Sequence, residues 1–389
     1  MPGNVGARIS SGNFPVQIAE SEDVQRDNRR RVALAMNGLV PMFDPQAQLF
    51  CFKLERTAAG LTRKGLSRRY TVISLMGLHE LEKRGTPSPI AIQPVLDGLL
   101  ANTDWVDNVG DLGLLLWLCA LTAPQCLEEI VSGLDVQSAL TRYRGARQGC
   151  TMELAWFLAG LSHVSLAQPG QFSELRDVAF RTYKLLRKNQ GEQGIFGHVA
   201  RSRNIFDMLR SRIGHFADQV YPIYALTKFG QAFRYEKATE SALDCALAIC
   251  QAQGALGQWW WHYDGTSGQA IGEFPVYSVH QHGMAPMALF ALGEAIQSDF
   301  SPWIYKGLRW IKDNELDFDM EDAPAKLVWR CISRPALKRY WTVIINTLGP
   351  RQGSKEDLEV VFECRPYELG WLLYAFAGRD ESSVAGLSS

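Results

Sequence analysis

Six helix-length runs of this chain are apolar nearly all the way round, and they limit its possible folds more than any other feature. A helix without a polar face must be buried on every side. Alternation of apolar and polar residues with period two is scarce, so we expect little β structure. The six runs begin at Arg69, Asp111, Thr151, Asp218, Gln281 and Tyr367.

A second set of runs lies between the apolar ones and carries charge on one face only, as amphipathic helices do. These runs are residues 88–101, 124–140, 172–189, 237–253 and 301–314. About six helices of each kind predict an all-α (α/α)6 toroid of about six helical hairpins. The apolar helices would form its inner barrel and the amphipathic helices its outer ring.

The chain is long enough for one large domain. We expect a single toroid domain over residues 25–378. The flanking segments 1–24 and 379–389 lack helical patterns and are predicted to be flexible tails.

The net charge of the chain and its use of cysteine limit the partners and the cellular location that we expect. A formal net charge of −1 gives no electrostatic reason to expect a nucleic-acid partner. No apolar stretch resembles a secretory signal or a membrane span, so no membrane insertion is expected. The eight cysteines include no CxxC pair and several lie within apolar runs, a usage typical of cytoplasmic proteins. Oligomeric state stays open.

The longest loops precede inner helices, at 191–217, 253–280 and 314–366, and would open at one mouth of the barrel. The starts of the inner helices would point to the same mouth. They carry the polar residues Tyr70, Asp111, Glu153, Asp218, His282 and Glu368. A polar ring above an apolar floor predicts a ligand site at this mouth.

Two sites resemble the repeat signature of terpenoid-cyclase and protein-prenyltransferase toroids, in which a glutamine closes an outer helix and a glycine and an aromatic residue follow. These sites are Gln190–Gly194–Phe196 and Gln253–Gly257–Trp259. Six-hairpin glycosidase-like toroids are similar in architecture and in their aromatic, acid-bearing loops. The resemblance covers about residues 65–378 and implies the fold. The DDxxD and DxDD motifs of isoprenoid chemistry do not occur.

The segment 257–282 concentrates the residues that suit a saccharide, because aromatic faces stack on sugar rings while acids and arginines bind hydroxyl groups. Adjacent tryptophans in an extended loop alternate sides, so Trp259 and Trp261 would face one way and Trp260 the other. The predicted binding residues are Trp259, Trp261, His262, Tyr263, Tyr277, His282, Arg201, Arg203, Tyr221, Arg365, Glu368 and Asp111.

Glycoside hydrolysis needs two carboxyl groups. We predict Asp218 and Asp264 for this role, with Glu273 in reserve. His280 is the fourth catalytic candidate, since a histidine could act as the base of an epimerase or lyase. Metal binding by His280 and His282, on one side of an extended segment, is an alternative; neither metal nor cofactor is predicted.

The leading hypothesis is a carbohydrate-active enzyme, of hydrolase, lyase or epimerase type, that acts on an oligosaccharide or a polysaccharide precursor. One alternative is an isoprenoid enzyme of the terpenoid cyclase or prenyltransferase kind, which requires a deep apolar chamber inside the barrel. The other is a non-catalytic toroid that binds a glycan or a protein.

Overall fold

The computed structural model describes residues 22–200, 211–335 and 357–379. The predicted binding residues Arg201 and Arg203 lie outside these ranges. So do residues 1–21 and 380–389 of the two predicted tails. Within them, no helix combines the length and the apolar character that crossing a bilayer requires.

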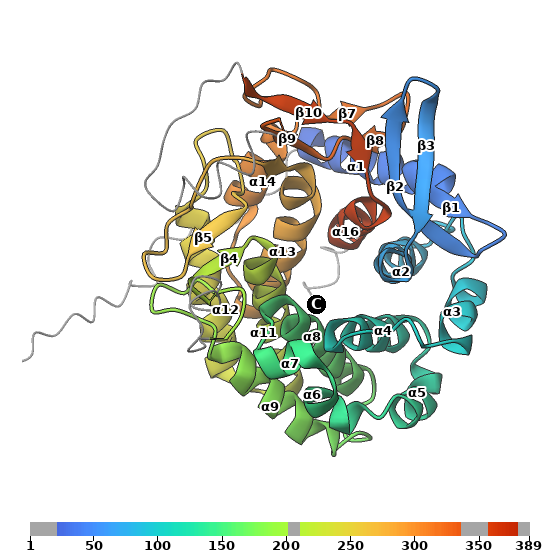
Figure 1. Cartoon of the computed structure of the whole chain (residues 1–389), viewed down its shortest axis with the longest axis vertical. Helices are drawn as coiled ribbons and strands as arrows, with labels where there is room; N and C mark the ends of the chain where they lie inside the picture. Colours follow the sequence, from blue (N-terminus) through green and yellow to red (C-terminus); the bar gives the residue numbers. More distant parts are fainter. Residues whose placement is uncertain (1–21, 201–210, 336–356, 380–389) are drawn as a thin grey trace, which may run out of the picture.

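Six inner helices surround the barrel axis, which confirms the predicted (α/α)6 architecture (Figure 1). Each inner helix begins within two residues of the start of one of the six predicted apolar runs. They are α2 (Arg68–Lys83), α4 (Val109–Thr122), α8 (Thr151–Ala167), α11 (Ala217–Phe233), the π-helical turn η4 (His280–Met284) continued by α13 (Ala285–Ile296), and α16 (Pro366–Phe376).

The outer ring consists of helices with one buried face. Its members are α1 (Glu22–Leu39), α3 (Ile92–Ala101), α5 (Leu127–Gly133), α9 (Leu175–Arg187), α12 (Glu236–Gln251) and α14 (Ser301–Trp310). Short helical turns complete the connections: η1 (Val40–Met42), η2 (Pro124–Cys126), η3 (Val136–Ser138), α6 (Ala139–Arg142) and α7 (Arg144–Gln148). Helix α1 packs against α16 and closes the ring, a role that the sequence pattern did not reveal.

The inner helices approach one another closely where glycines face neighbouring backbones. A Cβ on Gly160 of α8 would lie 2.2 Å from the carbonyl oxygen of Gly113 in α4. A Cβ on Gly77 of α2 would lie 2.3 Å from the carbonyl oxygen of Gly370 in α16. Any larger residue at Gly160 or Gly77 would force the helices apart, so these glycines set the width of the barrel.

All strand pairs of the described residues are antiparallel, and most strands have only two or three residues. The exception in length is one hairpin that the sequence analysis missed. This hairpin joins β2 (Leu49–Thr57) to β3 (Gly60–Leu66), and β2 also pairs with β1 (Phe43–Asp44) and β11 (Glu363–Cys364). The other pairs are β4 (Ile213–His215) with β5 (His262–Asp264), β7 (Glu321–Asp322) with β8 (Leu327–Val328), and β9 (Cys331–Ser333) with both β6 (Val276–Tyr277) and β10 (Glu359–Val361).

Aromatic rings fill the middle of the barrel. Trp117 is fully buried and stacks on His163 and Tyr224, with ring centroids 5.0 and 4.7 Å away. Trp371 and Tyr374 pack against the same indole. These side chains form the floor beneath the mouth.

Candidate functional site

A cavity of about 230 Å³ lies where the starts of the inner helices meet. Five of the six inner helices contribute residues to it, mainly from their first two turns, and loop segments complete the wall. Its lining consists of Arg69, Tyr70, Ile73, Met152, Trp156, Ala217, Tyr221, Trp261, Tyr277, Val279, His280, Met284, Arg330 and Tyr367. Among the predicted site residues, Tyr221, Trp261, Tyr277 and His280 are part of this lining.

Arg69 enters the cavity wall from the start of α2 and is held by the start of α4. Its Nε and Nη2 donate to the two carboxylate oxygens of Asp111 at 2.6 and 3.0 Å. Asn108 caps α4 by accepting from the backbone N–H of Asp111 at 2.9 Å, and its side-chain amide donates to the Asp111 carboxylate at 2.7 Å. The predicted binding residue Asp111 therefore acts on the cavity through Arg69.

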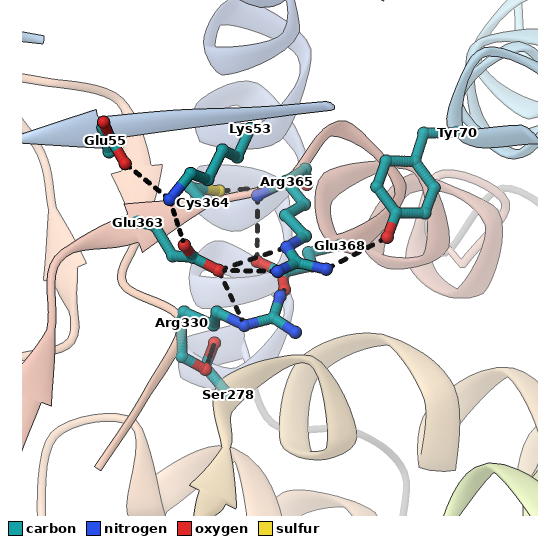
Figure 2. Close-up of polar contacts among 9 residues, drawn as sticks. All are labelled: Lys53, Glu55, Tyr70, Ser278, Arg330, Glu363, Cys364, Arg365 and Glu368. Atoms are coloured by element: carbon teal, nitrogen blue, oxygen red, sulfur yellow. Dashed lines mark hydrogen bonds and ion pairs between the residues drawn. The ribbon is translucent and has the colours of Figure 1, made fainter. Parts of the chain in front are cut away.

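Arg330, between β8 and β9, also lines the cavity and belongs to a network of ion pairs (Figure 2). Its Nη1 pairs with Glu368, which is fully buried at the start of α16, and its Nε lies 2.9 Å from Glu363. Burial alone would lower the pKa of Arg330, but Tyr367, Glu368 and the other neighbours raise it well above its usual range. The guanidinium group is thus a permanent cation in the cavity wall.

Arg365 belongs to the same network but does not line the cavity. Its Nε donates to Glu363 at 3.1 Å and its Nη1 donates to the Tyr70 hydroxyl at 3.1 Å, while its backbone N–H donates to Glu368 at 3.1 Å. Lys53 of β2 donates to Glu363 as well, at 3.1 Å (Figure 2). Arg365 and Glu368, both predicted to bind substrate, therefore hold Tyr70 and Arg330 in place.

Asp218, the acid in the first turn of α11, is bound by two histidines. Asp218 Oδ2 accepts from the backbone N–H of His215 at 2.9 Å, and the Nδ1 atoms of His198 and His215 lie 3.0 and 3.4 Å from the same oxygen. Burial by itself would raise the pKa of Asp218, but its bonds to these two histidines lower it. Asp218 is thus a buried carboxylate behind two partly exposed imidazoles.

His280 lies on the first turn of η4, with its ring 5.2 Å from that of Tyr277. Its Nδ1 is 3.3 Å from the carbonyl oxygen of Trp259, a position in which Nδ1 carries the proton. Burial lowers the pKa of His280 to about 3. The ring is therefore neutral at neutral pH, with Nε2 available as an acceptor.

Glu153 at the start of α8 differs from the other acids of the mouth. Its Oε2 is buried without a hydrogen-bond partner among the described residues, and burial raises the pKa of its carboxyl group. Met152, the residue before it, lines the cavity.

Other predicted site residues lie away from the cavity lining. Asp264 is bound by Arg212, whose Nε and Nη2 donate to it at 2.8 and 2.7 Å, and this pairing holds its pKa at about 2. Glu273 is exposed. Trp259 and Tyr263 are fully buried, and a Cβ on Gly307 would lie 2.7 Å from the indole nitrogen of Trp259.

The two histidines of the proposed metal alternative do not converge. Residues 280–284 form a π-helical turn rather than an extended segment, so His280 and His282 do not share one side. His282 is buried, and neither of its ring nitrogens has a partner among the described residues. His262 stacks on Trp261 at 5.0 Å, outside the cavity lining.

The structure adds residues that the sequence analysis did not propose for the site: Arg69, Trp156, Arg330 and Tyr367 in the cavity wall, and His198 and His215 around Asp218. A signal existed for Arg69 and Tyr367, because both occupy the first turn of an inner helix. No local pattern marks Arg330.

The aromatic floor around Trp117 occupies the space that an isoprenoid chamber would need. The structure therefore gives the isoprenoid alternative no support.

No known protein family and no curated protein matches this sequence. Several solved structures are similar to this protein in fold. A possible member of the GH105 family from Salmonella enterica serovar Paratyphi A is 12% identical, with a TM-score of 0.61 over 94% of this chain and 98% of that one. A sugar epimerase from a ruminal bacterium is 10% identical, with a TM-score of 0.61 over 92% and 99%.

An unsaturated glucuronyl hydrolase from Bacillus sp. GL1, which degrades glycosaminoglycan, is 14% identical, with a TM-score of 0.57 over 91% and 95% of the two chains. These likenesses show that the chain shares the (α/α)6 toroid fold of six-hairpin glycosidase-like proteins, the fold that its sequence predicted. Identities this low establish the fold and leave the activity to be argued from the site.

Proposed function

We propose that this protein is a carbohydrate-active enzyme whose mouth cavity binds a sugar that carries a carboxylate. One observation carries the proposal: two guanidinium groups, four phenols, two indoles and an imidazole line the cavity, and no carboxylate of the described residues does. Arginine binds carboxylates through paired, charge-assisted hydrogen bonds, while aromatic faces stack on sugar rings. A cavity below the ~300 Å³ of ordinary ligand pockets suits one terminal sugar ring.

The proposed reaction is proton transfer at the carbon next to this carboxylate. His280 Nε2 takes the C–H proton, and the electron pair of that bond moves into the carboxylate, whose added charge Arg69 and Arg330 stabilise. Return of a proton to the carbon gives the epimer. Expulsion of the oxygen substituent from the adjacent carbon, with its bonding electrons, gives an unsaturated sugar instead.

The surroundings of His280 support its role as base. The hydrogen bond toward the Trp259 carbonyl fixes the ring with its acceptor nitrogen free, and burial keeps the imidazole neutral. Arg330 contributes to the low pKa of His280, and the carboxylate of a bound substrate would offset that contribution. The imidazole would then become more basic when the substrate is present.

Hydrolysis is less well supported by this geometry. It requires two carboxyl groups at the scissile bond. Asp264 is occupied by Arg212 and Asp218 by the two histidines, and neither lines the cavity.

Binding and reaction can be tested separately. Titration followed by tryptophan fluorescence should show saturable binding of methyl glucuronide and at least tenfold weaker binding of methyl glucoside, which lacks the carboxylate. Equal affinity for both sugars would contradict the proposed role of the arginines.

For the reaction, uronate-terminated oligosaccharides are incubated in D₂O. Deuterium at the carbon beside the carboxylate indicates epimerisation, and new ultraviolet absorbance indicates elimination. Release of a saturated sugar without deuterium would show hydrolysis and refute proton transfer. Tight binding without any reaction across the panel would favour the non-catalytic alternative.

A further inference from the structure

Beside the cavity, the structure brings together two histidines and one aspartate from separate segments. One ring nitrogen of His198, one ring nitrogen of His215 and a carboxylate oxygen of Asp218 all lie within 4.8 Å of one another. His198 follows the outer helix α9, His215 ends β4, and Asp218 lies in the first turn of α11. Imidazole nitrogens with a carboxylate oxygen are a ligand set that Zn²⁺ uses in proteins.

We propose that His198, His215 and Asp218 bind one divalent first-row transition metal ion, with Zn²⁺ the best fit. In a tetrahedral zinc site, ligands about 2.0–2.2 Å from the metal lie ~3.3–3.6 Å from each other. The two imidazole nitrogens lie 3.0 and 3.4 Å from Asp218 Oδ2, close to this spacing. The two imidazoles, whose ligand atoms lie within 4.8 Å of each other, would turn toward the ion when it binds.

The backbone around the two histidines is fixed, as a preformed site requires. The glycine before each histidine packs directly on the other segment: a Cβ on Gly197 would lie 1.8 Å from the Ser211 carbonyl oxygen, and one on Gly214 would lie 1.9 Å from that of Phe196. The His198 N–H donates to the Ile213 carbonyl at 3.1 Å.

Gln219, one residue beyond Asp218, ties the same segments together. Its side-chain oxygen accepts from the Phe196 N–H at 2.8 Å, and its amide donates to the carbonyl oxygens of Phe196 and His215 at 2.9 and 3.1 Å. Supporting bonds of this kind orient metal ligands and strengthen metal binding.

The site has room for a ligand from outside the protein. The side chain of His198 is 20% exposed and that of His215 36%, while Asp218 is buried beneath them. Three protein ligands leave the fourth position of a tetrahedral ion open, as in catalytic zinc sites. Ala217 and Trp261 line the cavity next to this cluster, with the Trp261 ring 5.8 Å from that of His215. The open position would therefore lie at the cavity rim.

The test is a metal titration of the full chain after removal of metals with a chelator. Calorimetry and elemental analysis should give one Zn²⁺ per chain. Co²⁺ should bind at the same site, produce visible absorbance and be displaced by Zn²⁺, whereas Ca²⁺ and Mg²⁺ should not compete. His198→Gln should weaken Zn²⁺ binding at least ~100-fold, a larger loss than removal of a supporting bond causes.

His79, a histidine on helix α2 outside the ligand set, provides the matched control. His79→Gln should keep one Zn²⁺ per chain with affinity within a few-fold of the wild type. Less than one equivalent in the wild type, or unchanged affinity in His198→Gln, would overturn the proposal. If His215→Gln fails to fold by circular dichroism, His198→Gln still decides the question. Because no sugar enters this experiment, its outcome is independent of the proposed enzymatic function.

Discussion

The two sides of the mouth hold their acids by different means. On the side of α2 and α16, Asp111 and Glu368 pair with Arg69 and Arg330. On the side of α11, the equivalent first-turn acid, Asp218, is held by histidines. All three acids occupy the start of an inner helix, where the helix dipole favours a negative charge.

This difference separates two tasks. Guanidinium groups keep their charge at any physiological pH, so the arginine side can hold an anionic group but cannot exchange a proton. Neutral imidazoles can accept a proton or bind a metal ion. We infer that the arginine side binds the substrate carboxylate, whereas the histidine side and the neighbouring His280 supply reactive groups.

The largest expected effect is on the arginine side. Arg330→Gln leaves the buried carboxylate of Glu368 without its strongest partner, and removal of one member of a buried ion pair costs about 3–5 kcal/mol. Urea unfolding should show a loss of this size. The control is Arg26→Gln, because Arg26 and Asp23 are 70% and 79% exposed, and it should change stability by less than ~1 kcal/mol. Equal losses in the two variants would show that the network is no more than a surface feature.

On the reactive side, His280→Gln removes the proposed base while keeping a polar side chain. Deuterium incorporation should fall about 10²–10⁴-fold, the usual contribution of a general base. The Kd for methyl glucuronide should change by no more than a few-fold, since the arginines remain. A rise in Kd with an unchanged rate of exchange would instead show that His280 only binds the sugar.

The inner barrel could be predicted because a helix that is buried on all sides has apolar residues all the way round. Helix α1 could not, because the charged segment that opens it conceals the apolar face formed by Leu34 and Ala35. The β2–β3 hairpin also escaped, because many of its side chains are exposed and its pattern shows no clear alternation.

The site was predictable to a smaller extent. Tyr221 and His280 could be proposed because each lies near the start of an apolar run. The partners of the acids could not. Asp218 meets His198, and Asp264 meets Arg212, only after loops distant in sequence pack together. The π-helical turn at 280–284 likewise depends on tertiary packing, and it contradicts the alternative in which His280 and His282 bind one metal ion from an extended segment.

His282 lies on the same π-helical turn as His280, and the pH dependence of stability tests whether its buried imidazole is neutral. Burial lowers the pKa of His282 to about 3, against 6.5 for an unperturbed histidine. Between these values the unfolded chain binds a proton that the folded chain does not, so stability falls as pH falls. This histidine should contribute a loss of about 1.4 kcal/mol per pH unit below 6.5.

His282→Leu should remove that part of the pH dependence. Its free energy of unfolding, measured in urea at pH 7 and at pH 5, should fall by ~2 kcal/mol less over this interval than that of the wild type. Parallel curves for the two proteins would mean that the imidazole is protonated in the folded state, against the burial seen at this position.

The smallest expected effect concerns the tryptophans between the two sides. Trp261 lines the cavity, whereas the indole of Trp260 donates to the Ala252 carbonyl at 2.9 Å and does not. Stacking of an aromatic ring is worth about 0.5–1.5 kcal/mol, so Trp261→Leu should weaken methyl glucuronide binding by roughly 2- to 13-fold. Trp260→Leu is the matched control and should leave the Kd unchanged. Because the arginines attract the carboxylate and the indole only the ring, Trp261→Leu should weaken methyl glucoside by the same factor; a loss confined to the glucuronide would place Trp261 on the charge-binding side.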